Sequence, residues 1–277
     1  MTPDEYCQQK AAKSGSSFYY SFLFLPVPRR RAITALYAFC REVDDVVDEV
    51  SDPGVARTKL AWWRTEVADL FADHPHHPVT RALQPHIAEY GLDAARLNEI
   101  IDGMEMDLTH HRYADFESLR LYCHRVAGVV GQLSASIFGY RDPRTLEYAE
   151  ALGIAFQLTN IIRDVGEDAR RGRVYLPAGD LARFGLGVDD ILQLRGCPAF
   201  EQLMAFETQR AEAYYDEAFA KLPAADRRDQ RAGLIMAAIY RTLLREIRRD
   251  DFAVLQQRIA LTPLRKLWIA WKTWVAS

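Results

Sequence analysis

Residues 155–177 read AFQLTNIIRDVGEDARRGRVYLP. Within this stretch Asn160, Asp164 and Asp168 are spaced four apart. At about 3.6 residues per turn of an α-helix, side chains with this spacing point the same way. Apolar residues such as Ile161 and Ile162 share the same turns, and acids beside a buried apolar face are costly unless they have a partner. We call a row of oxygen-bearing side chains spaced four apart on one helix an acidic ladder. For a single acidic ladder, the commoner interpretation is a helix end exposed to solvent.

A second acidic ladder lies upstream, in LYAFCREVDDVVD at residues 36–48. Asp44 and Asp48 are four apart in it, and Arg41 precedes them by about one turn. Carboxylates on facing helices are how helical bundles build metal sites. Oxygen ligands without His or Cys favour hard cations, and Mg²⁺ is commonly bound by a few carboxylates together with substrate phosphates. The two ladders therefore predict Mg²⁺-dependent diphosphate chemistry, with Mn²⁺ as the alternative ion.

Composition narrows the class of protein. The chain has 277 residues, of which 49% are hydrophobic and 26% charged, as expected for a protein with a sizeable core. The net charge of −3 argues against nucleic-acid binding. The four cysteines are far apart, which favours reduced thiols and a cytoplasmic location. The N-terminus does not resemble a targeting peptide, and no run of apolar residues is long enough to span a membrane.

The hydrophobic periodicity predicts an all-α fold. Separators rich in Pro, Gly and Asp divide the apolar pattern, and no alternating strand pattern of useful length occurs. The predicted helices cover residues 28–50, 54–72, 78–90, 93–111, 115–139, 143–168, 181–184, 188–195, 198–221 and 226–250. No low-complexity linker divides the chain, so residues 1–277 are expected to form a single domain.

A final helix is predicted at residues 263–275, and it is amphipathic. Leu264, Trp268, Trp271 and Val275 share one face, and basic residues flank that face. This composition is typical of a helix that lies on a membrane surface. The alternative is that the same face packs onto the bundle as ordinary core.

Two other stretches leave alternatives open. SGSSFYYSFLFLP at residues 14–26 combines a small polar turn, including Ser17, with aromatics that should be buried. The turn could bind a diphosphate, or it could be a helix N-cap followed by core. YCHRVAGVVG at residues 122–131 carries Gly128 and Gly131 inside a predicted helix, either for close helix packing or to leave room for a long apolar ligand.

With these motifs in view, the chain resembles the squalene/phytoene synthase family of isoprenoid head-to-head condensing enzymes. The resemblance runs from about residue 14 to about residue 250, and QLTNIIRDVGEDARRGRVYLP is its most specific part. It implies a single-domain isoprenoid-synthase helical bundle with a central active-site cavity. GMEMDL at residues 103–108, RY at 112–113 and the basic-aromatic tail are most similar to bacterial presqualene diphosphate synthases of hopanoid biosynthesis.

That likeness implies a reaction: condensation of two farnesyl diphosphates to presqualene diphosphate, with release of diphosphate. Phytoene or dehydrosqualene synthase is the alternative activity, because those enzymes keep nearly the same motifs. Squalene synthases have tyrosine where this chain has Arg125, so no NADPH is expected. The partners expected are farnesyl diphosphate, downstream hopanoid-pathway enzymes and, peripherally, the cytoplasmic membrane.

The resemblance also assigns roles to residues of this sequence. The metal ligands it implies are Asp44, Asp48, Asn160, Asp164 and Asp168. Catalytic roles fall on the same four aspartates together with Tyr37 and Tyr240. The substrate-binding residues it implies are Ser17, Phe18, Phe22, Arg41, Gln157, Asn160, Arg163, Arg173 and Tyr175.

Overall fold

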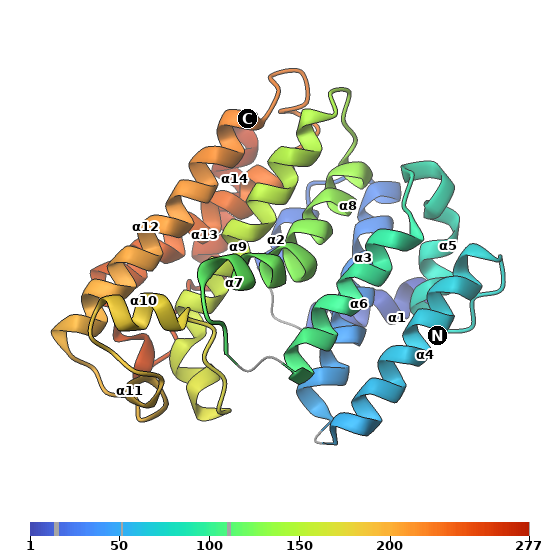
Figure 1. Ribbon diagram of the computed structural model, residues 1–277. Coiled ribbons are helices and arrows are strands. Elements are labelled where there is room, and N and C mark those ends of the chain that lie inside the picture. The colour runs from blue at the N-terminus through green and yellow to red at the C-terminus, as the bar shows by residue number, and fades with distance from the viewer. Residues whose placement is uncertain (14–16, 51, 110–111, 277) are drawn as a thin grey trace.

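The computed structural model consists mainly of helices and describes residues 1–13, 17–50, 52–109 and 112–276 (Figure 1). Of Ser17 and Tyr19 it describes the backbone alone. Within these residues the β structure is limited to one isolated bridge between Arg112 and Val174. The prediction of an all-α fold is therefore confirmed.

From α3 onward the helices follow the predicted order, whereas α1 was not predicted and α2 was one of two alternatives. The first half of the chain forms α1 (Pro3–Lys13), α2 (Ser17–Phe22), α3 (Val27–Glu49), α4 (Pro53–Phe71), α5 (Pro78–Tyr90), α6 (Ala94–Thr109), α7 (Phe116–Cys123), the π-helical turn η1 (His124–Gly128) and α8 (Val129–Phe138). The second half forms α9 (Arg144–Arg170), α10 (Ala178–Arg183), α11 (Val188–Leu192), α12 (Pro198–Lys221), α13 (Arg231–Arg249), the 3-10 turn η2 (Ala253–Leu255) and α14 (Pro263–Ala276).

Two predicted helices differ from the structure. The helix predicted at residues 226–250 begins only at Arg231, because residues 224–230 form turns. The helix predicted at 115–139 is interrupted by η1, in which the amide of Val129 donates to the carbonyl of His124, five residues back. Such π turns occur often at functional sites, and this one lies beside the cavity described below.

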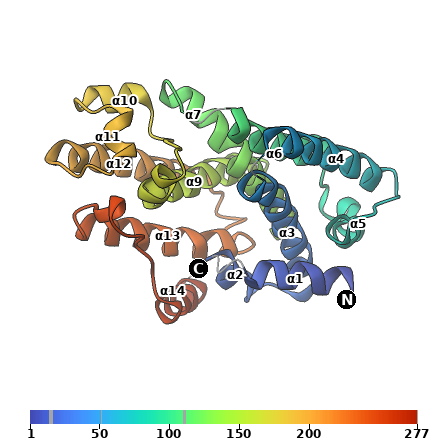
Figure 2. The same cartoon turned by 90° about the horizontal axis from the view of Figure 1, so that it is seen from below.

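The long helix α9 is the centre of the molecule. It packs against α8, η1, α12 and α13, and α3 packs against α1, α5 and α6 on the other side of the structure (Figures 1 and 2). These helices form two groups of buried apolar residues, and Phe18 and Val126 pack against both groups. The two acidic ladders, on α3 and α9, are thereby placed on different sides of one interior space.

Glycines allow η1 and α8 to approach α9 closely. A Cβ atom at Gly131 would lie 2.2 Å from the carbonyl oxygen of Ala149, and one at Gly153 would lie 2.2 Å from that of Ala127. No side chain fits at such distances, so these glycines are required by packing. Both also line the cavity, so at Gly131 close packing and space beside the cavity occur together, whereas Gly128, the other glycine of the motif, does not line it.

Within the described chain, no helix is both long and apolar enough to cross a bilayer. The C-terminal helix α14 spans Pro263–Ala276, close to its predicted range.

Candidate active site

A cavity of about 490 Å³ lies between α2, α3, α8, α9 and α13. One wall is aromatic: the ring of Phe18 lies 5.6 Å from that of Tyr37, and the ring of Phe156 lies 5.0 Å from that of Tyr240. The inner part is apolar and includes Leu152 and Phe138. The cavity therefore combines a long apolar interior with the charged ladders at one end.

The structure divides the predicted site residues into two sets. Those that line the cavity are Phe18, Phe22, Tyr37, Arg41, Asp44, Gln157, Asn160, Arg163 and Tyr240. Those that lie outside its lining, toward its charged end, are Asp48, Asp164, Arg173 and Tyr175. Asp168 is also outside the lining, within range of the charges of Asp164 and Arg173. The side chain of Ser17, predicted to bind substrate, is outside the described part of the chain.

On α3, one arginine holds two acids. Arg41 donates to Asp44 and, at 2.7 Å, to Asp45. Lys10 of α1 also contacts Asp45 at 2.7 Å. Asp45 is thus turned toward α1, which leaves Asp44 as the acid that faces the cavity.

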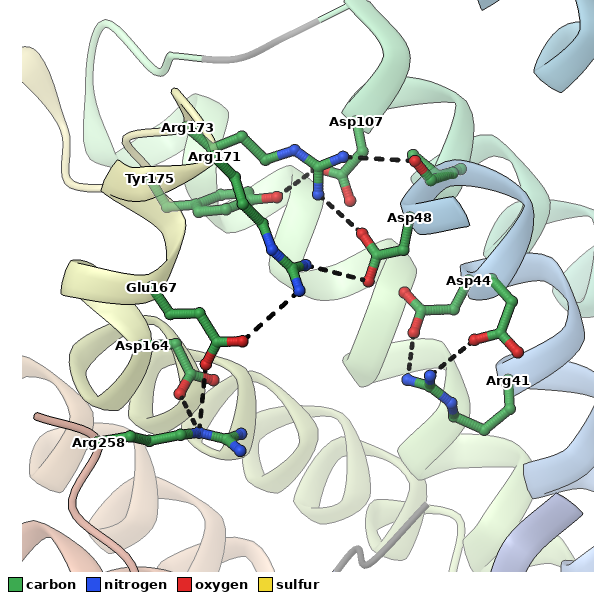
Figure 3. Close-up of polar contacts among 12 residues, drawn as sticks. Arg41, Asp44, Asp48, Asp107, Asp164, Glu167, Arg171, Arg173, Tyr175 and Arg258 are labelled. Atoms are coloured by element: carbon green, nitrogen blue, oxygen red, sulfur yellow. Dashed lines mark hydrogen bonds and ion pairs between the residues drawn. The ribbon is translucent and has the colours of Figure 1, made fainter. Parts of the chain in front are cut away.

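Arginines also reach across the space between the two ladders (Figure 3). Arg173 donates to Asp48 at 2.9 Å, and Arg171 lies 3.7 Å from the same carboxylate. On the α9 side, Asp164 accepts from Arg163 and, at 2.8 Å, from Arg258. Each of these contacts joins a predicted metal ligand to a guanidinium group of the kind that binds phosphate well.

Burial and neighbouring charges shift the acids of this end. Burial raises the pKa of Asp44 to about 7, with Asp48 and Asp107 adding to the shift and Arg41 opposing it. Burial, reinforced by the charge of Asp164, likewise raises the pKa of Asp168 to about 7. Both shifts come mainly from burial, which disfavours the charged carboxylates, and a cation bound beside them would favour the charged form.

The residues at this end fit an oxygen-binding divalent ion. The side-chain oxygen Oδ1 of Asn160 is buried without a hydrogen-bond partner, although its amide nitrogen donates to Gln157 at 3.3 Å. A buried acceptor without a donor is costly, and a cation would satisfy it. In the described residues, no three acid, His or Cys side chains converge into a metal cluster.

The site also contains residues outside the set that the sequence assigned to it, although one of them, Asp107, belongs to the GMEMDL stretch noted above. Asp107 is buried on α6 and accepts hydrogen bonds of 2.8 Å from both Tyr122 and Tyr175. Tyr175 thus bonds to Asp107 and does not line the cavity, whereas Tyr122 does. Tyr122 opens the YCHRVAGVVG motif, which was the one signal for it. Arg258 lies in a loop with no helical pattern, so no periodicity could have indicated it.

Arg125, the departure from squalene synthases, has a packing role. Its guanidinium lies 3.5 Å from the sulfur of Met106, and its Cβ would be 2.9 Å from a Cβ at Gly103. The side chain is therefore directed toward α6, and it is absent from the cavity lining.

Solved structures share this fold over nearly the full chain. A dehydrosqualene synthase crystallised with a ligand is 27% identical, with a TM-score of 0.86 over 99% of this chain and 96% of that one. The squalene synthase HpnC from Alicyclobacillus acidocaldarius is 31% identical, with a TM-score of 0.80 over 90% of this chain and 94% of that one. The fold is that of a helical isoprenoid synthase.

The squalene/phytoene synthase family model matches residues 11–265, and the chain belongs to that family. A phytoene synthase from Arthrospira platensis is 37% identical over 95% of this chain and 89% of its own length. Phytoene synthase 1 from Arabidopsis thaliana is also 37% identical, over 94% of this chain, and the match spans 63% of that longer protein. The predicted family is therefore confirmed. The two relatives are named phytoene synthases, which is the alternative activity given above, and HpnC is named a squalene synthase.

Proposed function

We propose that the protein condenses two prenyl diphosphates head to head into a cyclopropyl diphosphate, with farnesyl diphosphate as substrate and presqualene diphosphate as product. The observation that carries the proposal is one cavity that has arginines and half-buried or exposed carboxylates at one end and an aromatic and apolar interior behind them. A diphosphate matches the first part and a prenyl chain the second.

The charged end would bind the diphosphates. Asp44, Asp48, Asn160, Asp164 and Asp168 would hold Mg²⁺, which when bound neutralises charge on diphosphate oxygens. Arg41 and Arg163 line the cavity and offer planar, permanently charged forks to phosphate oxygens. Arg173 reaches the same end from the segment after α9.

The aromatic wall would protect the reaction. The C–O bond of the first substrate breaks, and its electron pair leaves with the diphosphate. The allylic cation that remains is attacked by the double bond nearest the diphosphate of the second substrate. Loss of one proton then closes the cyclopropane ring. Phe18, Phe22 and Tyr37 lie where aromatic faces can stabilise the cation, by about 0.5–2 kcal/mol each. Burial of this wall also excludes water from the cation.

We infer that the inner end of the cavity limits the length of the prenyl chain, and we assign it a C15 substrate. Tyr148 lines this end, at the N-terminal part of α9. The distance along the helix from Tyr148 to Asn160 is roughly 18 Å at about 1.5 Å per residue. Phytoene synthase, which uses a C20 substrate, is the second candidate, and the 37% identity to Arthrospira phytoene synthase favours it.

The proposal includes the setting of the reaction. Prenyl chains and their C30 products partition into lipid, so we place the protein in the cytoplasm, in peripheral contact with the membrane through α14. Downstream hopanoid-pathway enzymes would consume the product.

Product analysis tests the proposal. Purified protein is incubated with Mg²⁺ and farnesyl or geranylgeranyl diphosphate, each with and without NADPH. We expect a C30 cyclopropyl diphosphate from farnesyl diphosphate, unchanged by NADPH. A C40 hydrocarbon from geranylgeranyl diphosphate alone would establish the second candidate. Squalene that forms only with NADPH would contradict the prediction drawn from Arg125, and no product from either substrate would refute both candidates.

A further inference from the structure

The apolar face of α14 points away from the protein. Ala270 on the opposite face is fully buried, and Lys266 of that side lines the cavity. Leu264 is 80% exposed, Trp268 58% and Trp271 49%, and the rings of the two tryptophans stack at 5.1 Å. The alternative in which this face packs onto the bundle is therefore wrong for this structure.

A second segment extends the exposed apolar face. Phe24 stacks on Trp274 at a ring distance of 5.6 Å, and α2 packs against α14 (Figure 2). The turn between α2 and α3 exposes Leu23 and Val27 beside this contact. We call the combined set the α14 surface, and its members are Leu23, Val27, Leu264, Leu267, Trp268, Trp271, Trp274 and Val275.

The charge around the α14 surface indicates which kind of partner it can bind. Residues 252–277 contain no Asp or Glu, and neither do residues 14–41, although the whole chain carries a net charge of −3. Lys272 is exposed on α14, whereas Arg31, exposed near the start of α3, is paired with Asp4 of α1 at 3.5 Å. An apolar, tryptophan-bearing face with basic residues around it is complementary to an anionic lipid surface.

Two other occupants fit less well. A second copy in a twofold contact would bring the same basic residues together, and they would repel. The helix α14 is too short to span a membrane, because its 14 residues extend about 21 Å and the core of a bilayer is roughly 30 Å thick. The remaining arrangement has α14 lying flat on the bilayer.

The segments behind the α14 surface are cavity walls. Ile259, Ala260 and Leu261, which lead into α14, line the cavity together with Phe18 and Phe22 of α2. The same two segments therefore carry the exposed apolar face on one side and the prenyl-binding interior on the other.

We propose that the α14 surface docks on an anionic bilayer, and that prenyl chains pass between cavity and lipid through the wall formed by α2 and residues 259–266. The docking stands on the exposed face and the charges alone. The passage rests on the proposed function.

Vesicle co-sedimentation of the full chain tests the docking. The probes are vesicles of phosphatidylcholine alone and of phosphatidylcholine with phosphatidylglycerol. The test variant replaces Trp268 and Trp271 with Gln, and the matched control is Trp62→Gln, because Trp62 is 46% exposed on α4, outside the α14 surface. Lys272→Glu tests the charge. Circular dichroism verifies the fold of each variant, and sedimentation equilibrium of the wild type tests for a second copy.

We expect the wild type and Trp62→Gln to bind the anionic vesicles, and the double variant to bind about tenfold or more weakly. Lys272→Glu should weaken binding to anionic vesicles and leave the weaker binding to neutral ones unchanged. Equal binding by the double variant, a loss as large in Trp62→Gln, or a dimer that the double variant abolishes would overturn the docking.

Turnover tests the passage separately. Anionic vesicles should raise the steady-state rate of the wild type and leave that of the double variant unchanged, while both have equal rates without vesicles. Vesicle binding with no change in rate would overturn the passage and leave the docking standing. If no prenyl diphosphate is turned over at all, the proposed function fails, and the binding result is unaffected.

Discussion

Gly153→Ala tests whether the close approach of α9 to η1 holds the active site together. The added Cβ would lie 2.2 Å from the carbonyl oxygen of Ala127, 2.7 Å from its carbonyl carbon and 2.9 Å from Cα of Gly128. Ordinary contact begins at 3.4 Å, so the shortest distance falls short by about 1.2 Å. All three neighbours are backbone atoms, so no side chain can rotate away and the two helices must separate.

The size of the effect follows from two opposing contributions. Overpacking of this kind costs about 1–3 kcal/mol, and backbone neighbours place it at the upper end. Alanine recovers about 1 kcal/mol relative to glycine inside a helix. The net loss of about 2 kcal/mol lowers the melting temperature by roughly 4–8 °C for a chain of this size. Thermal unfolding followed by circular dichroism at 222 nm measures it.

Gly179→Ala is the matched control. Gly179 is also helical, in α10, and a Cβ there would lie 3.5 Å from the carbonyl oxygen of Ala114, an ordinary contact. Its melting temperature should equal or exceed that of the wild type. A Gly153→Ala protein that melts with the wild type, or no lower than Gly179→Ala, would refute the reasoning.

Three further predictions concern the site and its surroundings. Asp44→Asn and Asp164→Asn should each lower turnover about a hundredfold or more and leave the helicity unchanged. The reason is that removing a carboxylate at the charged end loses roughly 3 kcal/mol of transition-state stabilisation. Rates near those of the wild type would exclude the proposed ligand set. Tyr148→Ala should open the inner end of the cavity and raise the ratio of kcat/KM for geranylgeranyl diphosphate to kcat/KM for farnesyl diphosphate about tenfold. Tyr148→Phe should leave this ratio unchanged. An unchanged ratio in both variants would show that Tyr148 does not limit chain length. A hydrogen bond to Glu150 raises the pKa of His124 above 6.5, so protonated His124 stabilises the fold fully below about pH 6.5, and this stabilisation is lost as the pH rises through the raised pKa. The melting temperatures at about pH 6 and pH 9 should therefore differ less in His124→Gln than in the wild type. An equal difference in the two proteins would exclude this linkage.

The helices from α3 onward and the two acidic ladders could be predicted from the sequence, because both depend on the spacing of residues along one stretch of chain. Asp44 and Asp164 are placed by the 3.6-residue repeat of the helix that carries each. The π turn at His124–Gly128 was not readable, because it is stabilised by the backbone approach of α9 across Gly153. Arg258 was missed for a related reason: its contact with Asp164 joins residues 94 apart, from a loop. The outward direction of the α14 face was likewise undecided, since amphipathicity fixes which residues share a face and leaves open what that face meets.

If the charged end binds diphosphate as proposed, its arginines would lower the electrostatic cost of that binding. Arg41, Arg173 and Arg258 each hold a carboxylate of the two ladders, so the charges of Asp44, Asp48 and Asp164 are partly neutralised. A diphosphate brings oxygens that the same guanidinium groups bind in the same planar geometry. When an arginine turns from carboxylate to phosphate, the carboxylate it leaves can take part in holding a divalent cation. The total charge of the site then changes little, since the cation balances the anion. In the proposed function, both ladders and the arginines between them would act as one exchangeable set of ion pairs, and the ligands of the cation would come together when substrate binds.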